Sequence, residues 1–137
     1  MNKIKYDSDL IKLITLFESM SGAKVKDCIA NEKLTFIVEE NEMGRAIGKN
    51  GATIKRLENV LKKKIRLVEF SNDVLQFVRN MSYPIELGDV KEEDGIVTIS
   101  IKNTGTKAML IGRERQNINH LREIVKRYFD IKEIKIA

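Results

Sequence analysis

The chain has 137 residues, of which 42% are hydrophobic and 33% are charged, a balance that excludes a disordered tail and predicts a packed globular protein. Its single cysteine and single histidine exclude an internal disulfide and nearly exclude a zinc site, and no apolar run is long enough to span a membrane. We therefore expect a reduced, cytoplasmic protein that has no metal, no other cofactor and no membrane partner.

Hydrophobic spacing in the first half predicts helices mixed with strands. The spacing i, i+3, i+4, i+7 predicts a helix around residues 10–17, capped by Asp7 or Ser8 and ended by Gly22. The other predicted elements are, in order, strands 25–30 and 34–38 around a turn at 31–33, a helix near 43–47, a glycine turn, a helix burying Ile54, Leu57 and Leu61, and a strand at 65–70. The predicted order is α-β-β-α-turn-α-β.

The second half repeats this frame at an offset of 64 residues, the spacing between Gly48 and Gly112. The apolar face of residues 10–17 recurs over 74–81, the capping pair falls on Ser71-Asn72, and Leu67 falls on Ile131. Strands at 85–90 and 96–101 are expected on either side of the hairpin turn Asp94-Gly95, with their register shifted by about one residue from the first copy. This internal duplication predicts two domains, residues 1–70 and 71–137.

Positive charge gathers around the two glycine turns. Residues 45–66 carry eight basic side chains and one acidic side chain, and residues 107–127 carry six basic and two acidic ones. The segments before and between these blocks are net negative. Two basic blocks of this kind favour a polyanion as the partner. The run Lys62-Lys63-Lys64 is more simply a solvated helix end.

The turn Gly48-Lys49-Asn50-Gly51 has the composition of a phosphate-binding site. Glycines permit tight bending and close approach, and the helix that follows presents unpaired N–H groups and the positive end of its dipole. Lys49 and the nearby cations add charge. In form the turn resembles the GxxG loop of a KH domain, which clamps a few nucleotides of single-stranded RNA. The resemblance implies Ile47 and Ile54 as the nearest candidates to contact bases, although both are equally well explained as core. The candidate RNA-binding residues of this turn are Arg45, Ile47, Gly48, Lys49, Asn50, Gly51, Ile54, Lys55 and Arg56.

The two turns read AIGKNG and LIGRER, and together with the KRLE segment and the RYFDIKEIKI ending they resemble the tandem KH domains of NusA-type transcription factors. The resemblance is closest to the short archaeal NusA-like proteins and covers essentially the whole chain. It implies an α+β fold of two tandem KH domains, each with a three-stranded mixed sheet covered by helices on one face. Only residues 130–137 follow the last helix, so the helix and hairpin must precede the turn, as in prokaryotic-type (type II) KH domains.

The second turn departs from the glycine pattern, because Arg115 stands where the first copy has Gly51. Glu114 adds a charge of the wrong sign for phosphate. We expect weakened or altered binding there, with Gly112, Arg113 and Arg115 as the candidate contacts.

The resemblance implies a non-enzymatic factor that binds single-stranded nascent RNA in transcription termination or antitermination, with RNA polymerase as a further partner. A general RNA-binding or ribosome-associated KH protein, such as an RNA chaperone, is the alternative. A nucleotide-hydrolysing phosphate loop at Gly44–Lys49 is disfavoured, because three residues separate its glycines where four are needed and Asn50 replaces the required Ser or Thr.

Overall fold

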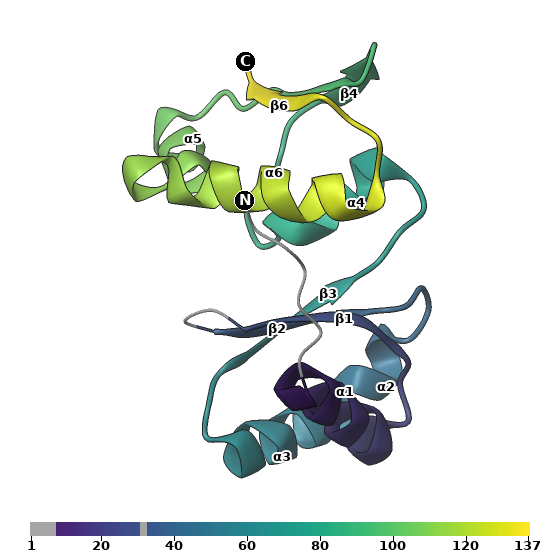
Figure 1. The fold of residues 1–137 in the computed structure, drawn as a ribbon. Helices are drawn as coiled ribbons and strands as arrows, with labels where there is room; N and C mark the ends of the chain where they lie inside the picture. The colour runs from purple at the N-terminus through teal and green to yellow at the C-terminus, as the bar shows by residue number, and fades with distance from the viewer. Residues whose placement is uncertain (1–7, 31–32) are drawn as a thin grey trace. The chain divides into compact units, whose positions relative to one another are not determined.

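The computed structural model describes residues 8–30 and 33–137. The chain divides into two compact units, Met1–Phe70 and Ser71–Ala137, and each unit contains helices and one three-stranded sheet (Figure 1). The predicted cap Asp7 and residues 31–32 of the turn predicted at 31–33 lie outside the described residues.

The first unit has the predicted order of elements. They are α1 (Ser8–Ser21), β1 (Val25–Ala30), β2 (Leu34–Val38), α2 (Met43–Ile47), a 3₁₀ turn (Lys49–Gly51), α3 (Ala52–Leu61) and β3 (Ile65–Glu69). The sheet order is β1-β2-β3, in which β2 pairs antiparallel with β1 and parallel with β3. Gly22 ends α1 as predicted, because its left-handed backbone (φ 73°) lets its N–H donate to Glu18 O.

Helices cover one face of the first sheet (Figure 1). Phe17 of α1 packs on Phe36 of β2 with ring centroids 4.3 Å apart, and Ala46 and Leu57 bring α2 and α3 into the same core. Ile54 and Leu61, predicted to be buried, are half-buried. Burial of this apolar surface provides the main driving force for the fold and fixes the helices on either side of the glycine turn.

The second unit repeats the order of elements, with longer helices on either side of its turn. Its elements are α4 (Val74–Ser82), β4 (Val90–Glu93), β5 (Ile96–Ile99), α5 (Thr104–Ile111), a 3₁₀ turn (Arg113–Arg115), α6 (Gln116–Tyr128) and β6 (Glu133–Ile136). The sheet order is β4-β5-β6, again antiparallel and then parallel. Phe77, Ile124 and Ile134 are fully buried at its centre.

The offset of 64 residues holds at the turns but not at the strands. Phe70 N donates to Val38 O and Ala137 N donates to Ile99 O, both at 2.8 Å, so these pairs are equivalent and the strand offsets are 61 and 67 residues. The cause is that α5 has eight residues where α2 has five, and α6 has thirteen where α3 has ten. The predicted one-residue shift and the match of Leu67 with Ile131 are therefore wrong, since each helix gains three residues.

Two predicted boundaries in the second unit are also wrong. The strand predicted from Ile85 begins at Val90, because Arg79 of α4 donates to Leu87 O and Gly88 O and holds this segment toward the helix. The strand predicted over 96–101 ends at Ile99. The cap of α4 is Asp73, whose carboxylate accepts from Leu75 N at 3.1 Å, whereas the predicted cap Ser71 accepts from Asp73 N in the preceding turn.

Candidate nucleic-acid interface

The first glycine turn follows α2 directly, and three of its four residues, Gly48, Asn50 and Gly51, have a positive φ. Gly48 N donates to Gly44 O at 3.0 Å and closes the helix, and the backbone then turns away at Gly48 (φ 78°, ψ 170°). Asn50 (φ 56°) and Gly51 (φ 73°) are left-handed, and Gly51 N donates back to Gly48 O at 3.1 Å. Because α3 starts at Ala52, the turn presents its backbone between two helix ends.

The two glycines of this turn are required for different reasons. A β-carbon on Gly48 would lie 2.8 Å from both the β-carbon and the backbone nitrogen of Thr53, so the fold itself excludes a side chain there. A β-carbon on Gly51 would come no closer than 3.8 Å to Ile54 and 3.9 Å to Lys55. Gly51 therefore serves the left-handed backbone and leaves its surroundings open to an approaching ligand.

The helices that follow the two turns have no side-chain cap. Asp73 accepts a backbone hydrogen bond at the start of α4, and Asn103 accepts one from Thr106 N at the start of α5. No side chain does so at the start of α3 or α6. The N–H groups of Ala52 and Gln116 donate to Lys49 O and Arg113 O, and the other N–H groups of each first turn, at the positive end of the helix dipole, have no side-chain cap.

The cations near the first turn are exposed. Lys49, Lys55 and Arg56 lie at the surface, and none of them forms an ion pair with a described residue. Arg45 is 3.7 Å from the carboxylate of Glu42, with 68% of its side chain exposed. Three cations without an ion pair to a described residue therefore lie close in the sequence to the backbone amides of the turn. Both kinds of group favour an anion as the ligand.

The two isoleucines beside the turn differ in exposure. Ile47 is 39% exposed at the end of α2, whereas Ile54 is half-buried in the first turns of α3. Ile47 therefore has more exposed surface for a base to cover, and the side chain of Ile54 is partly buried in the core.

The second turn keeps the backbone of the first without its second glycine. Gly112 (φ 77°, ψ 171°) matches Gly48 within a degree, and Glu114 (φ 53°) and Arg115 (φ 62°) are left-handed like Asn50 and Gly51. Left-handed conformations cost non-glycine residues about 1 kcal/mol or more each. The second turn is therefore held in this shape by its surroundings rather than by its composition.

Comparisons with known proteins identify the family. The KH domain family model matches residues 13–102. The probable transcription termination protein NusA of Methanococcus vannielii is 37% identical, over 98% of this chain and 80% of that protein. This chain belongs to the archaeal KH-domain NusA family. The relative of the same name in Methanocaldococcus jannaschii is 33% identical, over 99% of this chain and 76% of that protein.

A solved structure extends the similarity of this NusA-family chain to three dimensions. The crystal structure of APE1850 matches with a TM-score of 0.71 and 30% sequence identity, over 96% of this chain and 99% of that chain. The α+β KH fold predicted from the sequence is thereby confirmed at the level of the family.

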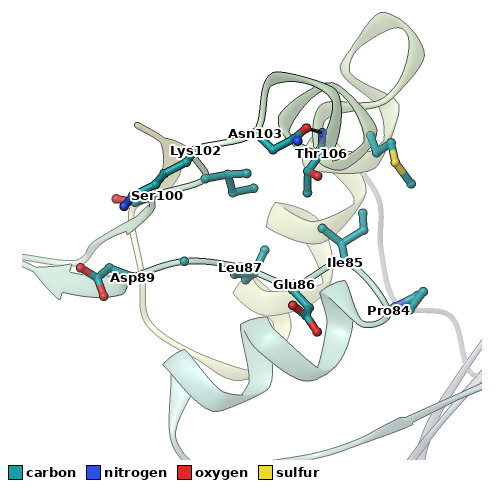
Figure 2. A pocket seen from close by; sticks show the side chains of 12 residues that line it. Pro84, Ile85, Glu86, Leu87, Asp89, Ser100, Lys102, Asn103 and Thr106 are labelled. Carbon is teal, nitrogen blue, oxygen red and sulfur yellow. Dashed lines mark hydrogen bonds between the residues drawn. The ribbon is translucent and has the colours of Figure 1, made fainter.

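The second unit also contains a groove that the sequence did not predict. It has a volume of about 770 Å³ and lies between residues 84–89 on one side and residues 100–103 with Thr106 and Met109 on the other (Figure 2). Residues 85–89, which were predicted to begin a strand, line this groove. Pro84 and Gly88, which are both unfavourable in a strand, are the sequence signals that were available for this departure.

Thr53 and Asn117 are site residues that the sequence reasoning missed. Each lies five positions after the first glycine of its turn, and each occupies the space that a side chain on that glycine would need. Asn117 also donates from Nδ2 to Met109 O at 2.9 Å, which ties the start of α6 to the end of α5. A small or amide side chain at the same repeat position was the available signal.

Two surveys of the described residues bear on other kinds of site. They contain no group of three or more His, Cys, Asp and Glu side chains that could hold a metal ion. Among their helices, none is long and apolar enough to cross a membrane.

Proposed function

We propose that this NusA-family chain binds single-stranded nascent RNA through the Gly48–Gly51 turn and acts, without enzymatic activity, in transcription termination or antitermination. The Gly112–Arg115 turn is proposed as a second, altered contact. We further propose that residues 1–70 and 71–137 are two type II KH domains. The support for this division is that both compact units have the same order of elements and the same strand order.

The main support for the RNA proposal is that both turns have the same backbone conformation and that each precedes a helix without a side-chain cap, α3 or α6. In the first copy, three exposed cations close to the turn in the sequence (Lys49, Lys55 and Arg56) have no carboxylate partner among the described residues. Backbone amides and cations hold a phosphate regardless of the base attached to it. The turn therefore positions the strand, and the exposed part of Ile47 lies beside it for a base.

Binding of single-stranded RNA by the double variant Lys49→Asp/Asn50→Asp tests this proposal. Both replacements are short polar residues, and aspartate tolerates the left-handed backbone of position 50, so the fold should survive. Two added negative charges at the amides should repel phosphate and abolish most of the affinity measured by fluorescence anisotropy. Lys91→Asp, an exposed position on β4, is a charge-reversal control at a site outside both turns. Equal affinity of the double variant and the wild type would overturn the proposal.

The polymerase contact is proposed on the family alone. An affinity-tagged chain should recover RNA polymerase subunits from an extract of its own cells treated with ribonuclease. Recovery of ribosomal proteins instead would favour the alternative, a general or ribosome-associated RNA-binding protein with the same loop chemistry.

A further inference from the structure

The exposed face of α3 carries positive charge well beyond the first turn. Helical spacing places Lys55 and Arg56 on the same side of α3 as Asn59 and Val60, near its C-terminal end. The single carboxylate of α3, on Glu58, is directed to the backbone, where it accepts from Ile65 N at 3.0 Å. Five exposed cations on α3 and its C-terminal end form no ion pair with any described residue: Lys55, Arg56, Lys62, Lys63 and Lys64.

The equivalent helix of the second unit treats its cations differently. Arg122 of α6 forms an ion pair with Glu133 at 2.6 Å, and Arg127 lies 3.7 Å from Glu123. These guanidinium groups are committed to neighbouring carboxylates within their own unit. Of the three cations of α6, only Lys126 is exposed without an ion pair to a described residue, whereas all five cations of α3 and its C-terminal end lack one.

The far end of the α3 face has a fixed backbone. Lys62 caps α3 in a left-handed conformation (φ 55°), a position where glycine is the usual residue. Leu34 N donates to Lys64 O at 3.3 Å, and β2 and β3 pair from Leu34 and Ile65 onward, so exposed Lys33 precedes Leu34 next to Lys64. The lysines thus sit on ordered backbone at the edge of the sheet.

We propose that α3 and residues 62–64 form a second RNA-backbone site, which extends the path of the strand from the Gly48–Gly51 turn along the helix. The ten residues of α3 span about 15 Å, a length sufficient for a few more nucleotides. This inference rests on the proposed function and adds to it a binding segment of three phosphate-contacting lysines. Its ligand is the phosphate backbone of a single strand longer than the turn alone can hold.

The test compares two oligonucleotide lengths. A short single-stranded RNA of about four nucleotides occupies the turn, and a longer one of about twelve also reaches the lysines. The triple variant Lys62→Gln/Lys63→Gln/Lys64→Gln should bind the short RNA with unchanged affinity and the long RNA more weakly. Its log–log salt slope for the long RNA should decrease by about 2, since each phosphate contact contributes about 0.7 on a single strand.

A charge-matched control is Lys91→Gln/Lys102→Gln/Lys135→Gln, which removes three exposed lysines from the second unit. It should leave the salt slope for the long RNA unchanged. An unchanged slope in the Lys62–Lys64 variant, or an equal loss in the control, would overturn the inference. Loss of all binding in the Lys49→Asp/Asn50→Asp variant alongside such a result would leave the proposed function intact. Full binding by that variant would instead show that the proposed function itself had failed.

Discussion

Gly51 and Arg115 end their two turns in nearly the same left-handed conformation, at φ 73°, ψ 16° and φ 62°, ψ 21°. Only one of them is the residue that adopts this conformation without steric cost. The turn in the second unit has therefore kept its shape while losing the residue that makes the shape easy. Conformation and composition can be separated experimentally at this pair.

Replacing Arg115 by glycine should stabilise the protein by about 1 kcal/mol, because the left-handed backbone no longer strains a side chain. Urea denaturation, followed by circular dichroism, measures the change in the free energy of unfolding. Gly51→Arg is the reciprocal variant and should destabilise the protein by a similar amount. A destabilised Arg115→Gly variant would mean that the arginine side chain makes contacts worth more than the strain.

Substitution of the first glycine of either turn should be destabilising by more than 1 kcal/mol, roughly, since the φ is positive and no room exists for a side chain. The repair should differ between the turns. The three atoms nearest to a β-carbon on Gly112 belong to the side chain of Asn117, whereas the three nearest to one on Gly48 include the backbone nitrogen of Thr53.

A double-mutant cycle measures this difference. Asn117→Ala should recover part of the stability lost in Gly112→Ala, and Thr53→Ala should recover less of that lost in Gly48→Ala. Equal recovery in both turns would contradict the assigned contacts.

Val60 and Ile124 occupy equivalent positions on α3 and α6 but differ in burial, at 57% and 0% exposed. Val60→Ala should change the free energy of unfolding by about 0.5 kcal/mol or less, as is usual at exposed sites. Ile124→Ala should cost about 2–5 kcal/mol through lost burial and a cavity. Thermal or urea denaturation of the two variants checks the prediction, and a costly Val60→Ala would show that a partner surface covers it in solution.

Cys28 should be unreactive toward iodoacetamide in the folded protein. Burial in β1, assisted by the charge of Asp27, raises the pKa of its thiol to about 12, so little thiolate forms at neutral pH. The unfolded chain ionises near the ordinary value of about 8.5. The contribution of the protonated Cys28 thiol to stability is therefore fully present below about pH 8.5 and is lost as the pH rises toward 12.

Alkylation rates in the native and urea-unfolded states measure this protection. In alkaline denaturation, Cys28→Ala should lose less stability than the wild type between pH 9 and 12, approximately. Rapid labelling of the native protein at neutral pH would contradict the burial of the thiol.

The first unit was largely predictable from the sequence, because each of its boundaries has a local cause. The strands at 25–30 and 34–38 and the helix at 43–47 agree with β1, β2 and α2. Phe17 and, in the second unit, Phe77 lie on the apolar helical faces predicted over residues 10–17 and 74–81, and both are fully buried. These features depend on periodicity and on turn residues, which are visible within a few positions.

The features that were missed depend on contacts between distant residues. Arg79 donates hydrogen bonds to carbonyl groups eight and nine positions away, in the segment before β4. The spacing of hydrophobic residues in that segment does not indicate these hydrogen bonds. The different roles of Gly48 and Gly51 depend on where Thr53 lies in space. Composition alone indicated that the lysine run 62–64 is a solvated helix end. The proposal that these lysines bind RNA depends on a contrast in the structure, because Arg122 and Arg127 of α6 form ion pairs and these lysines form none with a described residue.

The parallel pairing of β2 with β3, and of β5 with β6, determines the order in which the strands can pair during synthesis. A strand that pairs in parallel with its predecessor must wait for the whole intervening crossover, here the segment that carries the turn, to be synthesised. The local hairpin of each unit can close early, but its sheet is completed only when the strand after the crossover has left the ribosome. A chain that stopped before Ile65 would thus contain every residue of the first turn and lack the strand that secures it.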